Sequence, residues 1–207
     1  MRGNWQTITA AGAPTPRYSP AVTWSGSHLL VFGGSGCGFS TTASAAAFDP
    51  LGGTWSDIGC TVPSGDRANG VAFMDGGYMR HWLGNGGDTP AGLQYETSTG
   101  TWSAWALPTG TPSMLTDGVP ADDGRRLYFI RDTTGSCGPA SVVSYDRVTG
   151  AWLPEDTSAA PAGLMTGYQG AVPVWAGSEV IAWGGRCAGS GAGPSGVGGR
   201  YQPPAIP

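Results

Sequence analysis

Four copies of a short Gly-x-Trp phrase divide the chain into repeats of nearly constant length. The copies are Gly3-Asn4-Trp5, Gly53-Thr54-Trp55, Gly100-Thr101-Trp102 and Gly150-Ala151-Trp152. Their tryptophans are separated by 50, 47 and 50 residues. A period of this length is typical of repeat architectures in which each repeat is one supersecondary unit.

An aromatic residue stands seven positions before each of the last three tryptophans. These aromatics are Phe48, Tyr95 and Tyr145, and a fourth, Tyr201, has no tryptophan after it. Before each aromatic, two short β-prone stretches flank a glycine turn. The first members of these pairs are residues 21–24, 71–74, 119–121 and 171–175, and the second members are 29–32, 78–82, 127–130 and 180–183. Each repeat therefore predicts a four-stranded antiparallel meander, the unit of a propeller blade.

The ends of the second predicted strands resemble a known repeat family. Gly33-Gly34 and Gly184-Gly185, followed by the aromatic and then by the tryptophan, resemble the kelch repeat of the galactose oxidase central-domain-like superfamily. The corresponding pair reads Leu83-Gly84 in the second repeat and Arg131-Asp132 in the third. The resemblance covers nearly the whole chain and implies an all-β propeller of four kelch-like blades.

The two ends of the chain complement each other in sequence. The last repeat stops where a Gly-x-Trp strand is expected, and the chain begins with such a strand. We expect residues 1–8 to pair with the last blade and close the ring, because this pairing removes two unsatisfied sheet edges. The expected blades are residues 9–58, 59–105, 106–155 and 156–207 of a single domain. A ring made by two chains and a piece of a longer protein remain alternatives, and a monomer is favoured over a dimer.

Composition excludes several classes of partner. The 207 residues are enough for one domain with a sizeable core. The net charge is −4 and the arginines are scattered, so a nucleic-acid role is not expected. The sequence has no run of apolar residues long enough for a membrane helix, and no signal peptide is recognisable at its start.

The four cysteines are widely spaced in glycine-rich stretches, which favours disulfides, with free cysteines as the alternative, and does not support a zinc site. In the kelch alignment they lie in loops on one face of the disc. The preferred pairs are Cys37 with Cys60 and Cys137 with Cys187, and a Cys37–Cys187 bond stays open. If disulfides form, an extracellular or periplasmic location is favoured.

One column of polar residues precedes the expected innermost strands. It contains Ser19, Asn69, Asp117 and Gln169. These side chains are candidates for ligand binding at the mouth of the central channel, and the alternative is that they satisfy backbone groups and channel water. Arg131 and Asp132 interrupt the repeat beside the same mouth, either as further ligand contacts or as a local ion pair.

Other residue patterns indicate structure rather than chemistry. Trp55, Trp102 and Trp152 share one position on the outermost strand and are expected to fill the gaps between blades. Arg17 and Arg67 share an inter-blade position and are expected to be structural. His28 and His81 fall at different points of their repeats, so a copper site is not expected, and neither a metal nor another cofactor is predicted.

The sequence thus predicts a binding or scaffolding module that uses its loop face and channel mouth. The expected ligand is a small molecule, a glycan or a protein. A second hypothesis is a cofactor-free lyase, isomerase or epimerase, with Asp117 as base and Arg131 or Asn69 stabilising negative charge. A third is a partial propeller that assembles into a larger ring.

Overall fold

The computed structural model shows a chain built from β-strands and turns. It describes residues 5–36, 44–59, 70–82, 92–112, 120–132, 140–154, 156, 160–161, 164, 171–185 and 195–205. None of these residues is helical. Within this part of the chain, no helix is long and apolar enough to cross a membrane.

The first two blades are four-stranded antiparallel meanders. In each sheet the strands lie side by side in the order in which they follow one another along the chain. The first blade contains β2 (Ala21–Trp24), β3 (Leu29–Phe32), β5 (Ala45–Asp49) and β6 (Thr54–Asp57). The second contains β7 (Val71–Asp75), β8 (Tyr78–Trp82), β9 (Gly92–Glu96) and β10 (Thr101–Trp105). A short ribbon of β1 (Arg17–Tyr18) and β4 (Ser35–Gly36) accompanies the first blade.

The third blade is also four-stranded, but the fourth has three strands among the described residues. The third contains β11 (Ala121–Asp122), β12 (Arg126–Asp132), β13 (Ala140–Asp146) and β14 (Ala151–Trp152). The fourth contains β15 (Val172–Trp175), β16 (Val180–Trp183) and β17 (Gly198–Tyr201). The prediction of an all-β, four-bladed propeller is therefore confirmed.

The last three Gly-x-Trp phrases begin outermost strands because their glycines close a tight turn. Gly100 and Gly150 have φ values of 69° and 66°, a conformation that a residue with a Cβ adopts at a cost. Their N–H groups donate to the carbonyl oxygens of Glu96 and Asp146, at 2.9 and 2.8 Å. The next strand then returns beside the previous one, and Trp102 pairs with Tyr95.

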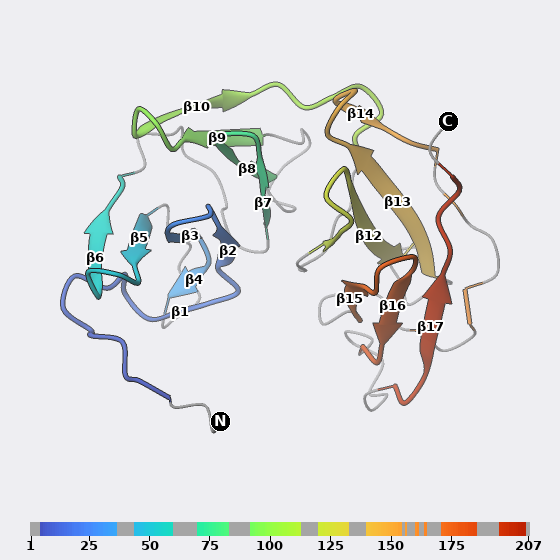
Figure 1. Ribbon diagram of the computed structural model, residues 1–207, viewed down its shortest axis with the longest axis horizontal. Helices are drawn as coiled ribbons and strands as arrows, with labels where there is room; N and C mark the ends of the chain where they lie inside the picture. The colour runs from blue at the N-terminus through green and yellow to red at the C-terminus, as the bar shows by residue number, and fades with distance from the viewer. Residues whose placement is uncertain are drawn as a thin grey trace.

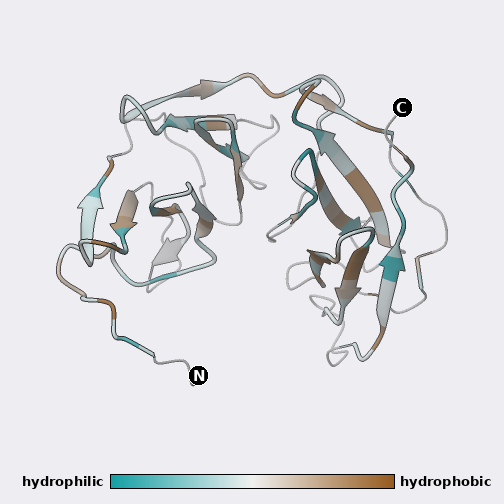
Figure 2. Ribbon diagram, viewed as in Figure 1, coloured by the Kyte–Doolittle hydropathy of each residue, from teal (hydrophilic) through white to brown (hydrophobic). Residues whose placement is uncertain are grey.

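The apolar core lies between neighbouring blades. Phe32 and Leu30 of the first blade pack with Met79 and Leu93 of the second. Further clusters join the second blade to the third and the third to the fourth. Figure 2 shows the apolar colour concentrated in strands such as β7, β13 and β16, whereas β6 and β17 are paler or polar.

Two of the three outermost tryptophans named in the sequence prediction also pack between blades, whereas Trp55 packs on Phe48 of its own blade. Trp102 contacts Phe32 of the preceding blade, with 5.0 Å between ring centroids. Trp152 contacts Trp82 of the preceding blade at 5.1 Å. Arg17 is structural, as expected, because its guanidinium donates to the carbonyl oxygens of Gly33 (2.8 Å) and Ser44 (3.2 Å). The expectation for Arg67 lies outside the described residues.

The predicted closure by the N-terminal strand is not seen in the described part of that strand, residues 5–8. Residues 5–10 form no strand, the side chain of Trp5 is 100% exposed, and β17 pairs with β16 only among the described strands. The N-terminal segment is held on the first blade instead, where the indole of Trp55 donates to the carbonyl oxygen of Thr9 at 3.2 Å. Figure 1 shows that the blades form an arc that is open between the first and the fourth, with β17 on the outer edge of the fourth.

Candidate functional site

The predicted channel-mouth column is only partly within the described residues. Ser19 is exposed just before β2 and has a φ of 46°. Asn69, Asp117 and Gln169 lie outside the described residues, so the converging polar ring stays a prediction. The same holds for the catalytic role of Asp117.

Arg131 and Asp132 end β12, where they pair in register with Ser141 and Ala140. The half-buried side chain of Arg131 lines a shallow hollow with Pro112 and Trp152. This hollow lies on the side of the third blade that faces the second. The four cysteines, Cys37, Cys60, Cys137 and Cys187, lie outside the described residues, so the disulfides also stay predictions.

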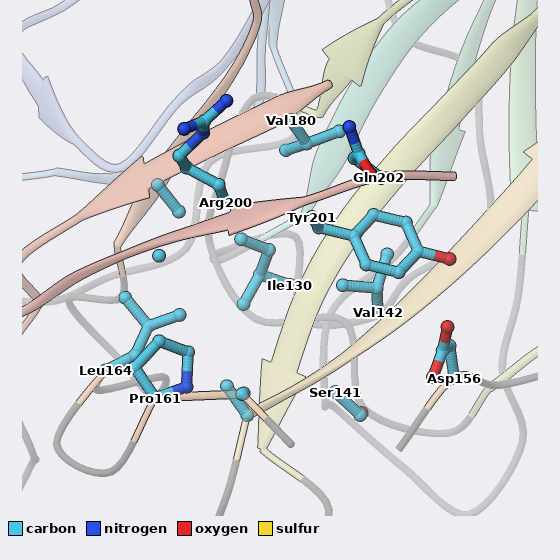
Figure 3. A pocket seen from close by; sticks show the side chains of 14 residues that line it. Ile130, Ser141, Val142, Asp156, Pro161, Leu164, Val180, Arg200, Tyr201 and Gln202 are labelled. Atoms are coloured by element: carbon cyan, nitrogen blue, oxygen red, sulfur yellow. The ribbon is translucent and has the colours of Figure 1, made fainter. Parts of the chain in front are cut away.

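A cavity of about 250 Å³ lies between the third and fourth blades. Its apolar lining includes Ile130, Val142, Leu164 and Val180. Figure 3 shows the ring of Tyr201 among these side chains. Polar groups also line the cavity, namely those of Ser141, Asp156, Arg200, Tyr201 and Gln202.

The phenol of Tyr201 is held as a hydrogen-bond donor. Burial, the negative charge of Asp156 and a hydrogen bond to the Asp156 carboxylate raise the pKa of Tyr201 to about 12. The hydroxyl therefore stays protonated at neutral pH and is a poor base.

Two interactions fix the fourth-blade wall of the cavity. Arg200 Nε pairs with Glu179 Oε2 at 2.8 Å across the blade. Arg126, which is buried in the third blade, donates from Nη2 to the carbonyl oxygen of Pro204 at 3.0 Å. The Tyr201 ring also packs edge-on against Tyr128, with 6.4 Å between centroids. The segment after β17 is thus tied to the third blade.

The cavity occupies the place that a tryptophan fills in the second and third blades. Trp102 packs on Tyr95 (5.1 Å) and Phe32 (5.0 Å) and donates to the carbonyl oxygen of Ile58 at 2.9 Å. Trp152 packs likewise on Tyr145 (5.3 Å) and Trp82 (5.1 Å) and donates to Thr111 Oγ1 at 3.0 Å. Each tryptophan therefore contacts the aromatic of its own blade, the second strand of the preceding blade and the linker between them.

The strand register identifies the same three walls around the cavity. Tyr201 pairs with Val180 as Tyr95 pairs with Met79 and Tyr145 with Leu127. Ile130 stands three residues after Leu127, as Trp82 stands three residues after Met79. The linker is represented by Asp156 and Leu164. The cavity is therefore the tryptophan slot of the fourth blade, left open because this blade has no outermost strand among the described residues.

The sequence contained a signal for this site, because Tyr201 is the one repeat aromatic with no tryptophan after it. Pairing of the chain's own first strand was expected to fill the gap, so no cavity was expected there. Comparison with protein-family models and with curated protein sequences found no match. The assignment of the site therefore rests on the geometry of the repeats.

Proposed function

We propose that the chain is a protein-binding module whose fourth blade accepts an extended peptide strand. The strand pairs with the edge of β17 and places an aromatic side chain in the cavity between the third and fourth blades. This is recognition by β-strand addition, in which backbone hydrogen bonds supply affinity and a side-chain pocket supplies specificity. The kelch-like character of the repeats agrees with this role, since the resemblance implies interaction modules among others.

The observation that carries the proposal is the correspondence between the cavity and the tryptophan slots of the other blades. Its walls match the environments of Trp102 and Trp152 in register and in position. The carboxylate of Asp156 lies at the linker wall, where an acceptor for an indole N–H stands in those blades. At about 250 Å³ the cavity is also smaller than ordinary small-molecule pockets, which span about 300–1,000 Å³.

The test uses the chain's own outermost strand as a probe. A fluorescein-labelled peptide with the sequence of residues 52–58, Gly-Gly-Thr-Trp-Ser-Asp-Ile, is titrated with the full chain, and anisotropy reports binding. The same peptide with alanine in place of tryptophan is the control. We expect the tryptophan peptide to bind more than tenfold more tightly, because its indole fills the cavity.

Two variants of the chain locate the binding. Ala160 is half-buried and lines the cavity, so Ala160→Trp is expected to fill the cavity and to weaken peptide binding at least tenfold. Ala176 is exposed in the turn between β15 and β16, so Ala176→Trp is expected to leave binding unchanged. Thermal melts show whether both variants fold.

Equal binding of the two peptides, or full binding by Ala160→Trp, contradicts the proposal. A monosaccharide panel on the same variants tests the glycan alternative. A sugar that binds the parent chain but not Ala160→Trp, with no peptide binding, replaces the protein-binding proposal with a glycan-binding one.

A further inference from the structure

We infer that the strand accepted by the fourth blade is the N-terminal segment of a second copy of this chain. This inference rests on the proposed function and names the partner of the same site. Residues Trp5–Ile8 of one copy pair with β17 of the other, and Trp5 enters the cavity beside Tyr201.

The N-terminal segment already continues into its own first blade as a linker does. Thr9 accepts the indole N–H of Trp55, as Ile58 accepts that of Trp102 and Thr111 that of Trp152. Ile58 and Thr111 both follow the outermost strand of the preceding blade. The residues before Thr9 therefore occupy the chain position of an outermost strand that belongs to a neighbouring blade.

This segment lacks a sheet partner in the described structure. The Trp5 side chain is 100% exposed and that of Ile8 is 51% exposed. The Gly-x-Trp phrase around Trp5 is that of the strands that fill the slots of the other blades.

A second copy of the chain supplies a β17 edge with which the N-terminal segment can pair. The arc is open between the first and fourth blades, and Thr9 holds the segment on the first-blade side (Figure 1). Each copy carries one donor segment and one acceptor edge, so two copies exchange segments around a two-fold axis and leave neither unmatched. The segment Trp-Gln-Thr-Ile has no charged side chain, so it brings no charge of its own into the cavity.

The fourth blade also presents an apolar face towards the opening. Val172 and Val174 of β15 pair in register with Trp183 and Ile181 of β16. All four side chains are exposed, by between 41% and 68%. In the expected two-copy assembly, the first blade of the partner approaches this side of the fourth blade. It would then cover the apolar face.

Sedimentation velocity of the full chain tests the inference. The expected species has twice the mass of the 21.0 kDa chain and dissociates on dilution. Trp5→Ala is expected to raise the dimer dissociation constant at least tenfold. Leu51→Ala is the matched control, because Leu51 is 98% exposed in the turn before β6 and lies outside the segment. Its dissociation constant is expected to equal that of the parent chain.

Further outcomes separate this inference from the proposed function. The residue 52–58 peptide is expected to dissociate the dimer, and Ala160→Trp to weaken it. A chain that stays monomeric at all concentrations overturns the inference, and peptide binding to that monomer leaves the proposed function intact. A monomer that Trp5→Ala destabilises shows closure within one chain and also overturns it. A dimer that Ala160→Trp leaves unchanged overturns the use of the cavity by Trp5.

Discussion

The acidic residue that follows the aromatic of the third strand caps the turn into the outermost strand. Asp146 Oδ1 accepts the N–H groups of Val148 and Thr149, at 2.8 and 3.2 Å, and Asp49 Oδ1 accepts that of Leu51 at 2.8 Å. Asp146 differs from Asp49 in that its Oδ2 also pairs with Arg125, at 2.8 Å. The sequence shows the acid in three repeats, and the structure explains it as turn chemistry rather than as a catalytic group.

We expect Asp146→Asn to reduce the sensitivity of the fold to acid. The hydrogen bond from Arg125, with the backbone N–H bonds, outweighs burial and holds the pKa of Asp146 below the ordinary value of an aspartate. A carboxylate whose pKa is lower in the folded state than in the unfolded state stabilises the fold at pH values above the unfolded-state pKa. This contribution is lost as the pH falls through the folded-state pKa. Urea denaturation at pH 7 and pH 3 is expected to show a smaller loss of unfolding free energy in the variant. At pH 7 the variant costs about 1–2 kcal/mol.

The control for this prediction is Asp122→Asn. Asp122 pairs with Arg147, but its side chain is 47% exposed, so the pair contributes little. We expect Asp122→Asn to cost less unfolding free energy at pH 7 than Asp146→Asn. An Asp146→Asn variant that loses as much stability in acid as the parent chain contradicts the role of the Arg125 pair.

At the scale of the element, an outermost strand restricts what the third strand beside it can tolerate. A Cβ built on Gly92 of β9 lies 2.7 Å from the Trp105 carbonyl oxygen of β10 and 2.7 Å from Leu107 Cδ2. Gly198 begins β17, which lacks such a neighbour among the described strands. Its Cβ lies 2.3 Å from Trp183 Cε3, and Trp183 is 68% exposed.

Gly92→Ala is therefore expected to destabilise the protein more than Gly198→Ala. The first change forces backbone to move and costs about 1–3 kcal/mol, as overpacking of a filled site does. In the second change an exposed indole turns aside, and the cost is smaller. Chemical denaturation followed by tryptophan fluorescence measures both, and equal losses contradict the argument.

The sequence predicted the strands well because each carries a local signal. Glycine turns and apolar runs mark β2, β8 and β16 within a residue or two of their observed positions. The third repeat was harder, since Arg131-Asp132 replaces the diglycine, yet its Tyr145 and Trp152 identified the blade. The position of the N-terminal segment was not predictable from the sequence. The Gly-x-Trp pattern is compatible both with pairing to β17 and with packing on Trp55, and only the long-range geometry of the blades distinguishes the two.

At the scale of the whole molecule, the open end leaves the fourth blade with an uncovered face. Trp82 and Trp183 occupy equivalent positions at the ends of β8 and β16. Trp82 is 4% exposed and packs against Phe129 and Leu127 of the next blade. Trp183 is 68% exposed because no described blade packs against that face of the fourth blade.

Replacing these two tryptophans by alanine is expected to give very different losses of stability. Trp82→Ala removes a buried indole and costs about 3–5 kcal/mol. Trp183→Ala removes an exposed one and stays within about 0.5 kcal/mol of the parent chain. Urea denaturation at a concentration where the chain is monomeric gives both values. A large loss for Trp183→Ala contradicts the open arrangement of the arc.

Trp55, Trp102 and Trp152 each donate a hydrogen bond to the segment that precedes their own blade. This arrangement affects how the number of blades can change in evolution. The first three blades are each bonded in this way to the segment that precedes them, so a duplicated repeat inserted at a linker brings its own tryptophan and can form the same bond to the linker before it. After loss of a repeat, the next tryptophan can bond to the new preceding linker in the same way. The number of blades can therefore change, and the gap between the first and last blades becomes wider or narrower.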